Sequence, residues 1–391
     1  MKIGIITFHF PYNCGATLQC AALQTKLQQM GHQVSVINYR PWYHQNRYVP
    51  FKNPVYYAGK MMKKQGENDL LAKRLFRGAD GFARVVYSWR NCKKIMPRDS
   101  RFKNFIRNNL HQTSVYRTLD QLNRRPPKLD MYVCGSDQLW NAKLTEGAFD
   151  PAYFLRFGGK DVKRISYSMG ANFDSLDDPQ KHLKPLLSDF QAVSLREEKC
   201  LADVRQALPE GVQAYVHIDP TLLLEEKDYV DMMSKQPLET EPFILTYTMP
   251  NESQHKIYNA ARIFGEKMNM KVIDVSGNPN KVNQKVQDNR ICGPDEFLWY
   301  MKNAAYVLTN SFHGTAFSVI FRKQFAVVPH TETGNRVSEL LEKLGLGHRW
   351  TKTGDQAAKI IESAIDYTAC EQNLKKLRDE ATDYLRKQTE E

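Results

Sequence analysis

The chain opens with the pattern of a β-strand, a glycine-containing turn, an α-helix and a second β-strand. The apolar stretch 2–7 predicts the first strand, and a turn at 11–16 follows it. Helical periodicity then predicts a helix over 17–30, which Gly31 ends, and 33–38 predicts the second strand. Such a unit is typical of parallel α/β sheets, because a helical crossover returns the chain to the same end of the sheet.

The same alternation of strands and helices continues to the C-terminus. Further strands are predicted at 130–134, 162–167, 192–195, 213–218, 243–247, 271–275, 306–308 and 325–329. Helices are predicted at 196–208, 255–268, 295–303, 336–344 and 356–387, and another follows His313. The charged stretch 225–240 contains Pro237 and indicates a crossing between two domains. A chain of 391 residues is long enough for two domains of ordinary size.

The predicted first domain spans 1–225, the second spans 241–365, and a C-terminal helix covers 366–391. Two α/β halves of similar make-up that face one another suggest an enzyme with a cleft between them. A mostly helical segment, 41–128, interrupts the first sheet, and we call it the basic insertion. It holds 20 Lys and Arg residues against 5 Asp and Glu, whereas the whole chain has a net charge of +12.

The basic insertion is expected to attract polyanions, such as acidic glycans or an anionic membrane surface. The alternative is a solvated surface with dispersed charges. Nucleic acid is not expected as a partner, because no recognisable nucleic-acid-binding module accompanies the charge.

Several features of the sequence favour a cytoplasmic protein. No apolar run reaches the roughly 18 residues that a membrane-spanning helix needs. The apolar stretch at 1–8 is too short for the core of a signal peptide and has no small-residue cleavage site. The 7 cysteines are scattered without a C-x-x-C pair, which argues against bound zinc and fits a reduced compartment. We therefore expect a cytoplasmic protein whose basic insertion contacts the inner face of the membrane.

An ionisable histidine follows the apolar stretch 305–308. Asn310 and Ser311 come next, and His313 and Gly314 open a helical pattern of small residues. In open α/β sheets, ligands bind at the carboxyl ends of the strands, and the free N–H groups of a helix start favour anions. The pattern predicts a ligand site with an imidazole. The alternative is a histidine that only caps the helix.

Polar motifs also follow two strands of the first domain. Asn13 and Gly15 lie in the first turn, where Gly15 permits close backbone approach to a ligand. A simple tight turn is the alternative. The candidates after strand 130–134 suit sugar hydroxyls, with a tryptophan face for a sugar ring: Ser136, Asp137, Gln138, Trp140 and Asn141. A helix cap with a core tryptophan is the alternative for this motif.

Two arginines complete the candidate site. Arg196 follows strand 192–195 and is predicted to open a helix, and Arg336 lies at another helix start. The planar guanidinium of arginine suits a carboxylate or a phosphate. The alternatives are a surface ion pair of Arg196 with Glu197 or Glu198 and a surface position for Arg336.

Taken together, these motifs resemble those of the polysaccharide pyruvyl transferase family. The motifs in family order are Asn13-Cys14-Gly15-Ala16 with Leu18-Gln19, Gly135-Ser136-Asp137-Gln138-Leu139-Trp140-Asn141, Ser194-Leu195-Arg196-Glu197, Asp219-Pro220-Thr221-Leu222-Leu223, Ser311-Phe312-His313-Gly314-Thr315 and Asn335-Arg336-Val337. The resemblance implies a GT-B-like fold, with two Rossmann-like α/β domains around a cleft. The basic insertion matches no motif of the family.

The resemblance also implies an activity and roles for the candidate residues. The family transfers the carbon skeleton of phosphoenolpyruvate to a sugar of a bacterial exopolysaccharide, capsule or lipid-linked precursor, forming a cyclic ketal and releasing phosphate. His313 would be the general acid, or acid and base in succession, and Asp137 would orient or deprotonate the acceptor hydroxyl. Arg196 and Arg336 would bind the phosphoenolpyruvate with amides near Gly15 and Gly314, and the scheme requires neither a cofactor nor a metal. The candidates assigned to binding are Asn13, Gly15, Ser136, Gln138, Trp140, Asn141, Arg196, Ser311, Gly314 and Arg336.

Two other functions stay open from the sequence. A GT-B glycosyltransferase that uses a nucleotide sugar would also need an anion site beside a His-Gly turn. A non-catalytic glycan- or membrane-binding protein would rely on the basic insertion instead.

Overall fold

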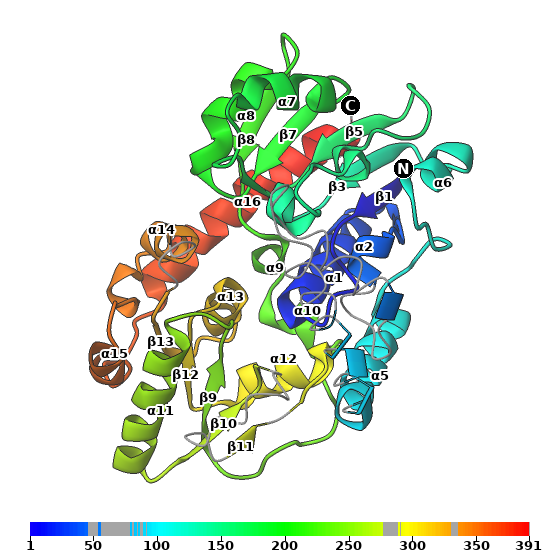
Figure 1. The fold of residues 1–391 in the computed structure, drawn as a ribbon. Helices are drawn as coiled ribbons and strands as arrows, with labels where there is room; N and C mark the ends of the chain where they lie inside the picture. Colours follow the sequence, from blue (N-terminus) through cyan, green and yellow to red (C-terminus); the bar gives the residue numbers. More distant parts are fainter. Residues whose placement is uncertain are drawn as a thin grey trace.

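A computed structural model describes residues 1–45, 54–55, 79, 82–83, 85–86, 89–90, 92–276, 288–289, 291–329 and 335–390. The polypeptide forms two lobes, each built around a parallel β-sheet with helices against it (Figure 1). The predicted α/β fold class is therefore confirmed.

The first sheet has the strand order β2-β1-β3-β5-β7-β6-β4, with β8 beside β7, and its strand pairs are parallel. Its strands are β1 (Lys2–Ile6), β2 (Gln33–Val36), β3 (Met131–Cys134), β4 (Asp137–Asn141), β5 (Lys163–Ser166), β6 (Met169–Asn172), β7 (Ala192–Leu195) and β8 (Gln213–Val216). The helices of this lobe are α1 (Cys14–Gln29), α2 (Trp42–Gln45), α5 (Cys92–Asn109), α6 (Leu119–Arg124), α7 (Pro179–Leu187), α8 (Leu201–Ala207), α9 (Pro220–Leu223) and α10 (Glu226–Val230). Short 3-10 helices lie at Ala142–Leu144, Pro151–Phe154 and Glu198–Cys200.

The second sheet has the strand order β11-β10-β9-β12-β13, again with parallel pairs. Its strands are β9 (Phe243–Tyr247), β10 (Lys271–Asp274), β11 (Asp288–Asn289), β12 (Tyr306–Thr309) and β13 (Gln324–Val327). Its helices are α11 (Gln254–Met268), α12 (Pro294–Asn303), α13 (Phe312–Ile320), α14 (Asn335–Lys343), a 3-10 turn at Gly347–Arg349, and α15 (Gly354–Ile360). In both sheets the strand order reverses next to the first strand of the lobe, which is where α/β folds bind ligands.

The last helix, α16 (Thr368–Glu390), leaves the second lobe and lies along the first (Figure 1). The Tyr384 hydroxyl donates to the carbonyl of Ser166 at the end of β5, 2.8 Å away. The Arg378 guanidinium donates to the carbonyls of Leu222 and Leu224, at and just beyond the end of α9. The predicted C-terminal helix therefore ties the two lobes together.

The two lobes also share one apolar core. Buried side chains of α1, such as Leu18, belong to the same cluster as Leu222 of α9, Phe297 of α12 and Phe317 of α13. Because apolar surface of both lobes is buried in this core, the core fixes how these helices lie relative to one another.

Three details of the predicted secondary structure were wrong. The helix at 196–208 begins only at Leu201, after a 3-10 turn, so Arg196 does not open a helix. The pattern at 356–387 is divided between α15 and α16, and α1 begins at Cys14, where the Asn13 side chain caps it.

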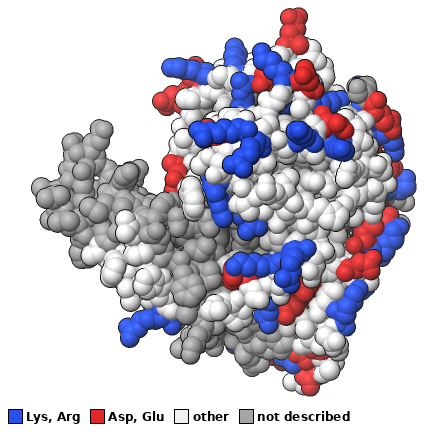
Figure 2. Space-filling model, turned by 90° about the vertical axis from the view of Figure 1, so that its right-hand side faces the viewer, with Lys and Arg blue, Asp and Glu red and all other residues white. Residues whose placement is uncertain are grey.

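Much of the basic insertion lies outside the described residues, which in this segment are 41–45, 54–55, 79, 82–83, 85–86, 89–90 and 92–128. The described part includes helices α2, α5 and α6. On the face in Figure 2, Lys and Arg side chains stand beside Asp and Glu side chains. Among the described residues, no helix combines the length and the apolar character needed to cross a membrane.

Candidate functional site

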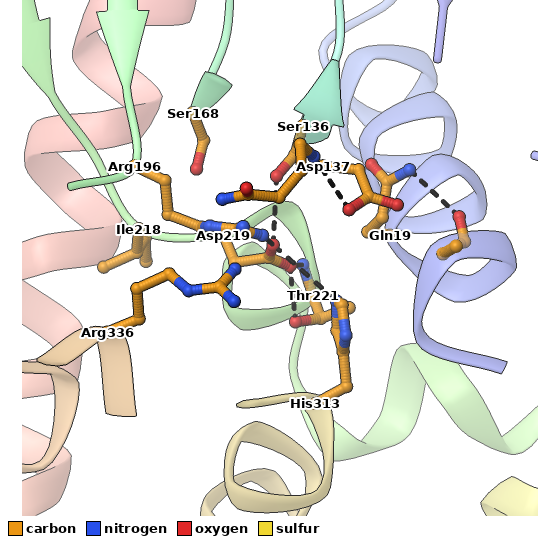
Figure 3. Close-up of polar contacts among 12 residues, drawn as sticks. Gln19, Ser136, Asp137, Ser168, Arg196, Ile218, Asp219, Thr221, His313 and Arg336 are labelled. Atoms are coloured by element: carbon orange, nitrogen blue, oxygen red, sulfur yellow. Dashed lines mark hydrogen bonds and ion pairs between the residues drawn. The ribbon is translucent and has the colours of Figure 1, made fainter. Parts of the chain in front are cut away.

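Candidate residues from both lobes meet where the carboxyl ends of the strands face one another (Figure 3). Ser136 and Asp137 follow β3, and Arg196 follows β7. Asp219 follows β8, and His313 lies at the start of α13 after β12. Parallel strands end at the same edge of a sheet, so residues that are far apart in the sequence are brought together there.

Asp219 is the carboxylate at the centre of this group. Its Oδ2 accepts hydrogen bonds from the Ser136 hydroxyl and from Nη1 of Arg196, each at 3.0 Å. Its Oδ1 accepts from the amide and hydroxyl of Thr221, at 3.0 and 2.8 Å, and so caps α9. Burial, the largest influence, raises the pKa of Asp219, but His313, Arg196 and Thr221 together outweigh it and lower that pKa. Asp219 is therefore ionised although it is buried.

Two arginines share a second carboxylate, Glu197. Nε of Arg196 lies 3.2 Å from Oε1 of Glu197, and Nε of Arg336 lies 3.6 Å from the same oxygen. Burial alone would lower the pKa of Arg196, but Glu197 and Asp219 outweigh it and raise that pKa. The Arg196 side chain is 4% exposed and that of Arg336 is 22% exposed. Arg196 does pair with Glu197, as the surface alternative supposed, but the pair is buried.

His313 is the second residue of α13 and does not cap this helix. The cap is Ser311, whose hydroxyl accepts from the amide of Gly314 at 3.4 Å. The Nε2 atom of His313 is buried and has no hydrogen-bond partner among the described residues; it lies 3.8 Å from Oδ2 of Asp219. Burial lowers the pKa of His313, although the charge of Asp219 opposes this. In the free protein the imidazole is therefore harder to protonate than an ordinary histidine, and its Nε2 atom is not engaged in a hydrogen bond with any described residue.

The backbone of the first lobe packs directly against this imidazole. A Cβ atom added to Gly15 would lie 2.1 Å from Nδ1 of His313, so only glycine fits there. The approach of Gly15 to a ligand stays a prediction; in the structure the group that Gly15 approaches is His313. The contact sets the position of the ring relative to α1.

A pocket opens beside the arginines, with a cavity volume of about 40 Å³. The residues that line it include Arg196, Glu197, Asp219, Phe312, Arg336 and Lys343. The Phe312 ring lies 4.9 Å from the Arg196 guanidinium, which stacks over it. Glu339 also lines the pocket, so its wall offers three cations and three carboxylates to a small polar ligand.

Trp140 does not belong to this site, and its predicted role as a face for a sugar ring is wrong. Its side chain is 0% exposed and stacks on Phe154 with ring centroids 4.9 Å apart. Its indole N–H donates to the carbonyl of Tyr153. Strand β4 turns the indole into the core of the first lobe, as the core-tryptophan alternative supposed.

The other predicted polar residues hold the backbone in place. Asn13 accepts from the amide of Ala16 and caps α1. Asn141 donates to the side chain of Gln138 and accepts from the amide of Lys143. Asp137 has a positive φ of 84°, and its Oδ1 accepts from the amide of Gln138.

Two charged residues of the site were not predicted. Asp219 was noted only as part of a motif, and Glu197 only as part of a motif and as a surface partner of Arg196. An Asp-Pro pair directly after strand β8 was the available signal, because it places a carboxylate at the carboxyl end of a parallel strand.

Known proteins identify the family and the fold type of this chain. The sequence model of the polysaccharide pyruvyl transferase family matches residues 13–332. The chain belongs to the polysaccharide pyruvyl transferase family. It is therefore a transferase, and the match includes Asp137, Arg196, Asp219 and His313 but ends before Arg336. Among curated proteins, none matches the sequence significantly.

Solved structures resemble this pyruvyl transferase in fold. UDP-GlcNAc 2-epimerase from Neisseria meningitidis, bound to UDP-GlcNAc, has a TM-score of 0.50 at 10% identity, over 100% of this chain and 99% of its own. The Methanocaldococcus jannaschii UDP-GlcNAc 2-epimerase, in complex with UDP-GlcNAc and UDP, has a TM-score of 0.47 at 12% identity, over 96% and 99%. The Streptomyces nogalater glycosyltransferase SnogD has a TM-score of 0.39 at 12% identity, over 98% and 95%. The fold is of the GT-B type, with two Rossmann-like domains.

Proposed function

We propose that this pyruvyl transferase moves the pyruvyl group of phosphoenolpyruvate onto two hydroxyls of one sugar, forming a cyclic ketal and releasing phosphate. The sugar belongs to a cell-surface glycan or to its lipid-linked precursor. The observation that carries the proposal is the buried Nε2 of His313, which has no hydrogen-bond partner among the described residues and lies near Arg196 and Arg336. An acid–base group next to fixed positive charge is what an anionic enol phosphate requires.

Arg336 is the side chain that would bind the anion directly. It is the more exposed of the two arginines and points toward the centre of the site in Figure 3. The amides at the start of α13, a helix of nine residues, would add hydrogen bonds to the same anion. Arg196 is held by Asp219 and Glu197, so its guanidinium is not free to bind the anion with both arms. It would instead contribute positive charge and keep the neighbouring side chains in place.

His313 would give and then take a proton. Its protonated Nε2 gives the proton to the methylene carbon of phosphoenolpyruvate, which leaves the neighbouring carbon electrophilic. A sugar hydroxyl, oriented by Asp137, bonds to that carbon and passes its proton back to His313. Phosphate leaves with the electron pair of its C–O bond, and the second hydroxyl closes the ring while its proton goes to the departing phosphate. These steps use no metal ion or cofactor.

The protonation of His313 should depend on the bound anion. Burial keeps its pKa below the ordinary value of 6.5 in the free protein. A phosphoenolpyruvate anion nearby favours the imidazolium, so we expect the pKa to rise when the substrate binds. An NMR titration of histidine ¹³Cε1 signals, with and without phosphoenolpyruvate, measures both values. The His313→Gln variant identifies the signal among the 10 histidines, and an equal pKa in both states would contradict the expectation.

The transfer itself is tested with purified protein, phosphoenolpyruvate and glycosides of galactose or N-acetylhexosamines. We expect phosphate release together with the mass gain of one pyruvyl ketal on the sugar. The alternative is a GT-B glycosyltransferase that uses a nucleotide sugar. This alternative is tested because the chain is similar in fold to a structure with bound UDP-GlcNAc. Turnover of UDP-sugars without any ketal formation would reject the pyruvyl transfer and favour that alternative.

A further inference from the structure

The buried side chain of Gln19 has a fixed orientation. Gln19 lies on α1, is 0% exposed, and its Nε2 donates to the Thr7 hydroxyl and to the Ala16 carbonyl, each at 2.9 Å. The Thr7 hydroxyl donates its own proton to the Ser136 carbonyl at 2.6 Å, so it can only accept from Gln19. Both partners of the amide are therefore acceptors, and the nitrogen must face them.

This orientation leaves the amide oxygen without a donor. The Oε1 atom of Gln19 is buried and has no hydrogen-bond partner in the part of the chain that the structure describes. Buried polar atoms are nearly always hydrogen-bonded, because desolvation without a replacement bond is unfavourable. Because Thr7 and Ala16 hold this side chain in place, the oxygen that no described residue contacts with a hydrogen bond indicates a missing donor.

The oxygen lies on the Asp137 side of the site. Thr7 links Gln19 to the carbonyl of Ser136, the residue before Asp137. In Figure 3 the Gln19 amide stands next to Asp137, whereas Arg336 enters from the opposite side of Asp219. Gln19 Oε1 and the Asp137 carboxylate are both acceptors. They would repel a phosphate or a carboxylate and accept hydrogen bonds from hydroxyl groups.

We propose that Gln19 is an acceptor-binding residue whose Oε1 accepts a hydrogen bond from a hydroxyl of the sugar that receives the pyruvyl group. This inference rests on the proposed function, and it gives the sugar a binding residue in place of Trp140. Gln19 and Asp137 together select a neutral ligand rich in hydroxyls, which would bind at a different place from the anion beside Arg336.

The test compares two glutamine-to-methionine variants of the same helix. Gln19→Met removes Oε1 with little change in side-chain size. Gln24→Met is the matched control, because Gln24 is also buried on α1 but both ends of its amide are bonded, to the carbonyl of Asn109 and the amide of His111. Binding of methyl β-galactopyranoside and of an N-acetylglucosamine methyl glycoside is measured by NMR titration, and phosphoenolpyruvate binding by calorimetry.

We expect Gln19→Met to weaken glycoside binding about tenfold, the effect of one lost hydrogen bond, with phosphoenolpyruvate binding unchanged. Gln24→Met should leave both affinities unchanged. The inference is overturned by wild-type glycoside affinity in Gln19→Met, by an equal loss of phosphoenolpyruvate binding, or by no glycoside binding to the wild-type protein. A wild-type protein that binds glycosides through Gln19 but not phosphoenolpyruvate would instead refute the proposed function alone.

Discussion

His313→Gln is expected to lower the turnover number of pyruvyl transfer by about 10²- to 10⁴-fold, the usual contribution of a general acid–base residue. Glutamine can occupy the space of the ring but cannot exchange protons near neutral pH. Because Nε2 of His313 has no hydrogen-bond partner among the described residues, its loss removes no such bond. Melting temperature should therefore change little, and initial rates of phosphate release measure the effect.

A second histidine supplies the control for this variant. His255 is likewise the second residue of a helix, α11, but it is exposed to solvent. His255→Gln should leave the rate unchanged. If His313→Gln kept a rate similar to that of His255→Gln, His313 would have no part in proton transfer.

Arg196→Met is expected to destabilise the protein by about 3–5 kcal/mol, as the loss of one partner from a buried ion pair does. The substitution leaves the carboxylates of Asp219 and Glu197 buried without their nearest cation. The midpoint of urea unfolding should fall accordingly. Adding Asp219→Asn to Arg196→Met should restore part of the loss, because it removes one of the uncompensated charges.

The control for Arg196 is an arginine in a solvent-exposed pair. Arg262 bonds to Glu266 one helical turn away on α11, with side chains 46% and 65% exposed. Arg262→Met should change stability by less than about 1 kcal/mol. An equally small change for Arg196→Met would mean that water or another cation compensates the two carboxylates.

Local sequence patterns predict some parts of the site and not others. Arg196 and His313 were correctly placed after strands, because the end of a short apolar run predicts the end of a buried strand. Their meeting at one edge follows from parallel sheets, since successive crossovers return every strand in the same direction. The partners of these residues were not predictable in the same way. Asp219 is 23 positions from Arg196, and Arg336 comes from the other lobe.

The errors have a common physical cause. Trp140 was assigned to the cleft by its neighbours in the sequence, but packing against Phe154 and Phe190 decides which way the indole points. The helix expected from Arg196 starts five residues later, because the intervening residues form a turn that holds Arg196 against Asp219. Side-chain direction after a strand depends on contacts that are distant in the sequence.

Local sequence patterns were enough to predict the alternation of strands and helices, the two parallel sheets, and the ordered motifs that place the chain in its family. These features depend on periodicity and on residues that are neighbours along the chain. Three features follow from tertiary packing instead: His313 lies against Gly15, Asp219 joins Ser136 to Arg196, and Gln19 Oε1 has no hydrogen-bond partner among the described residues. Those properties depend on burial and on hydrogen bonds between distant segments, which exist only once the two lobes are packed together.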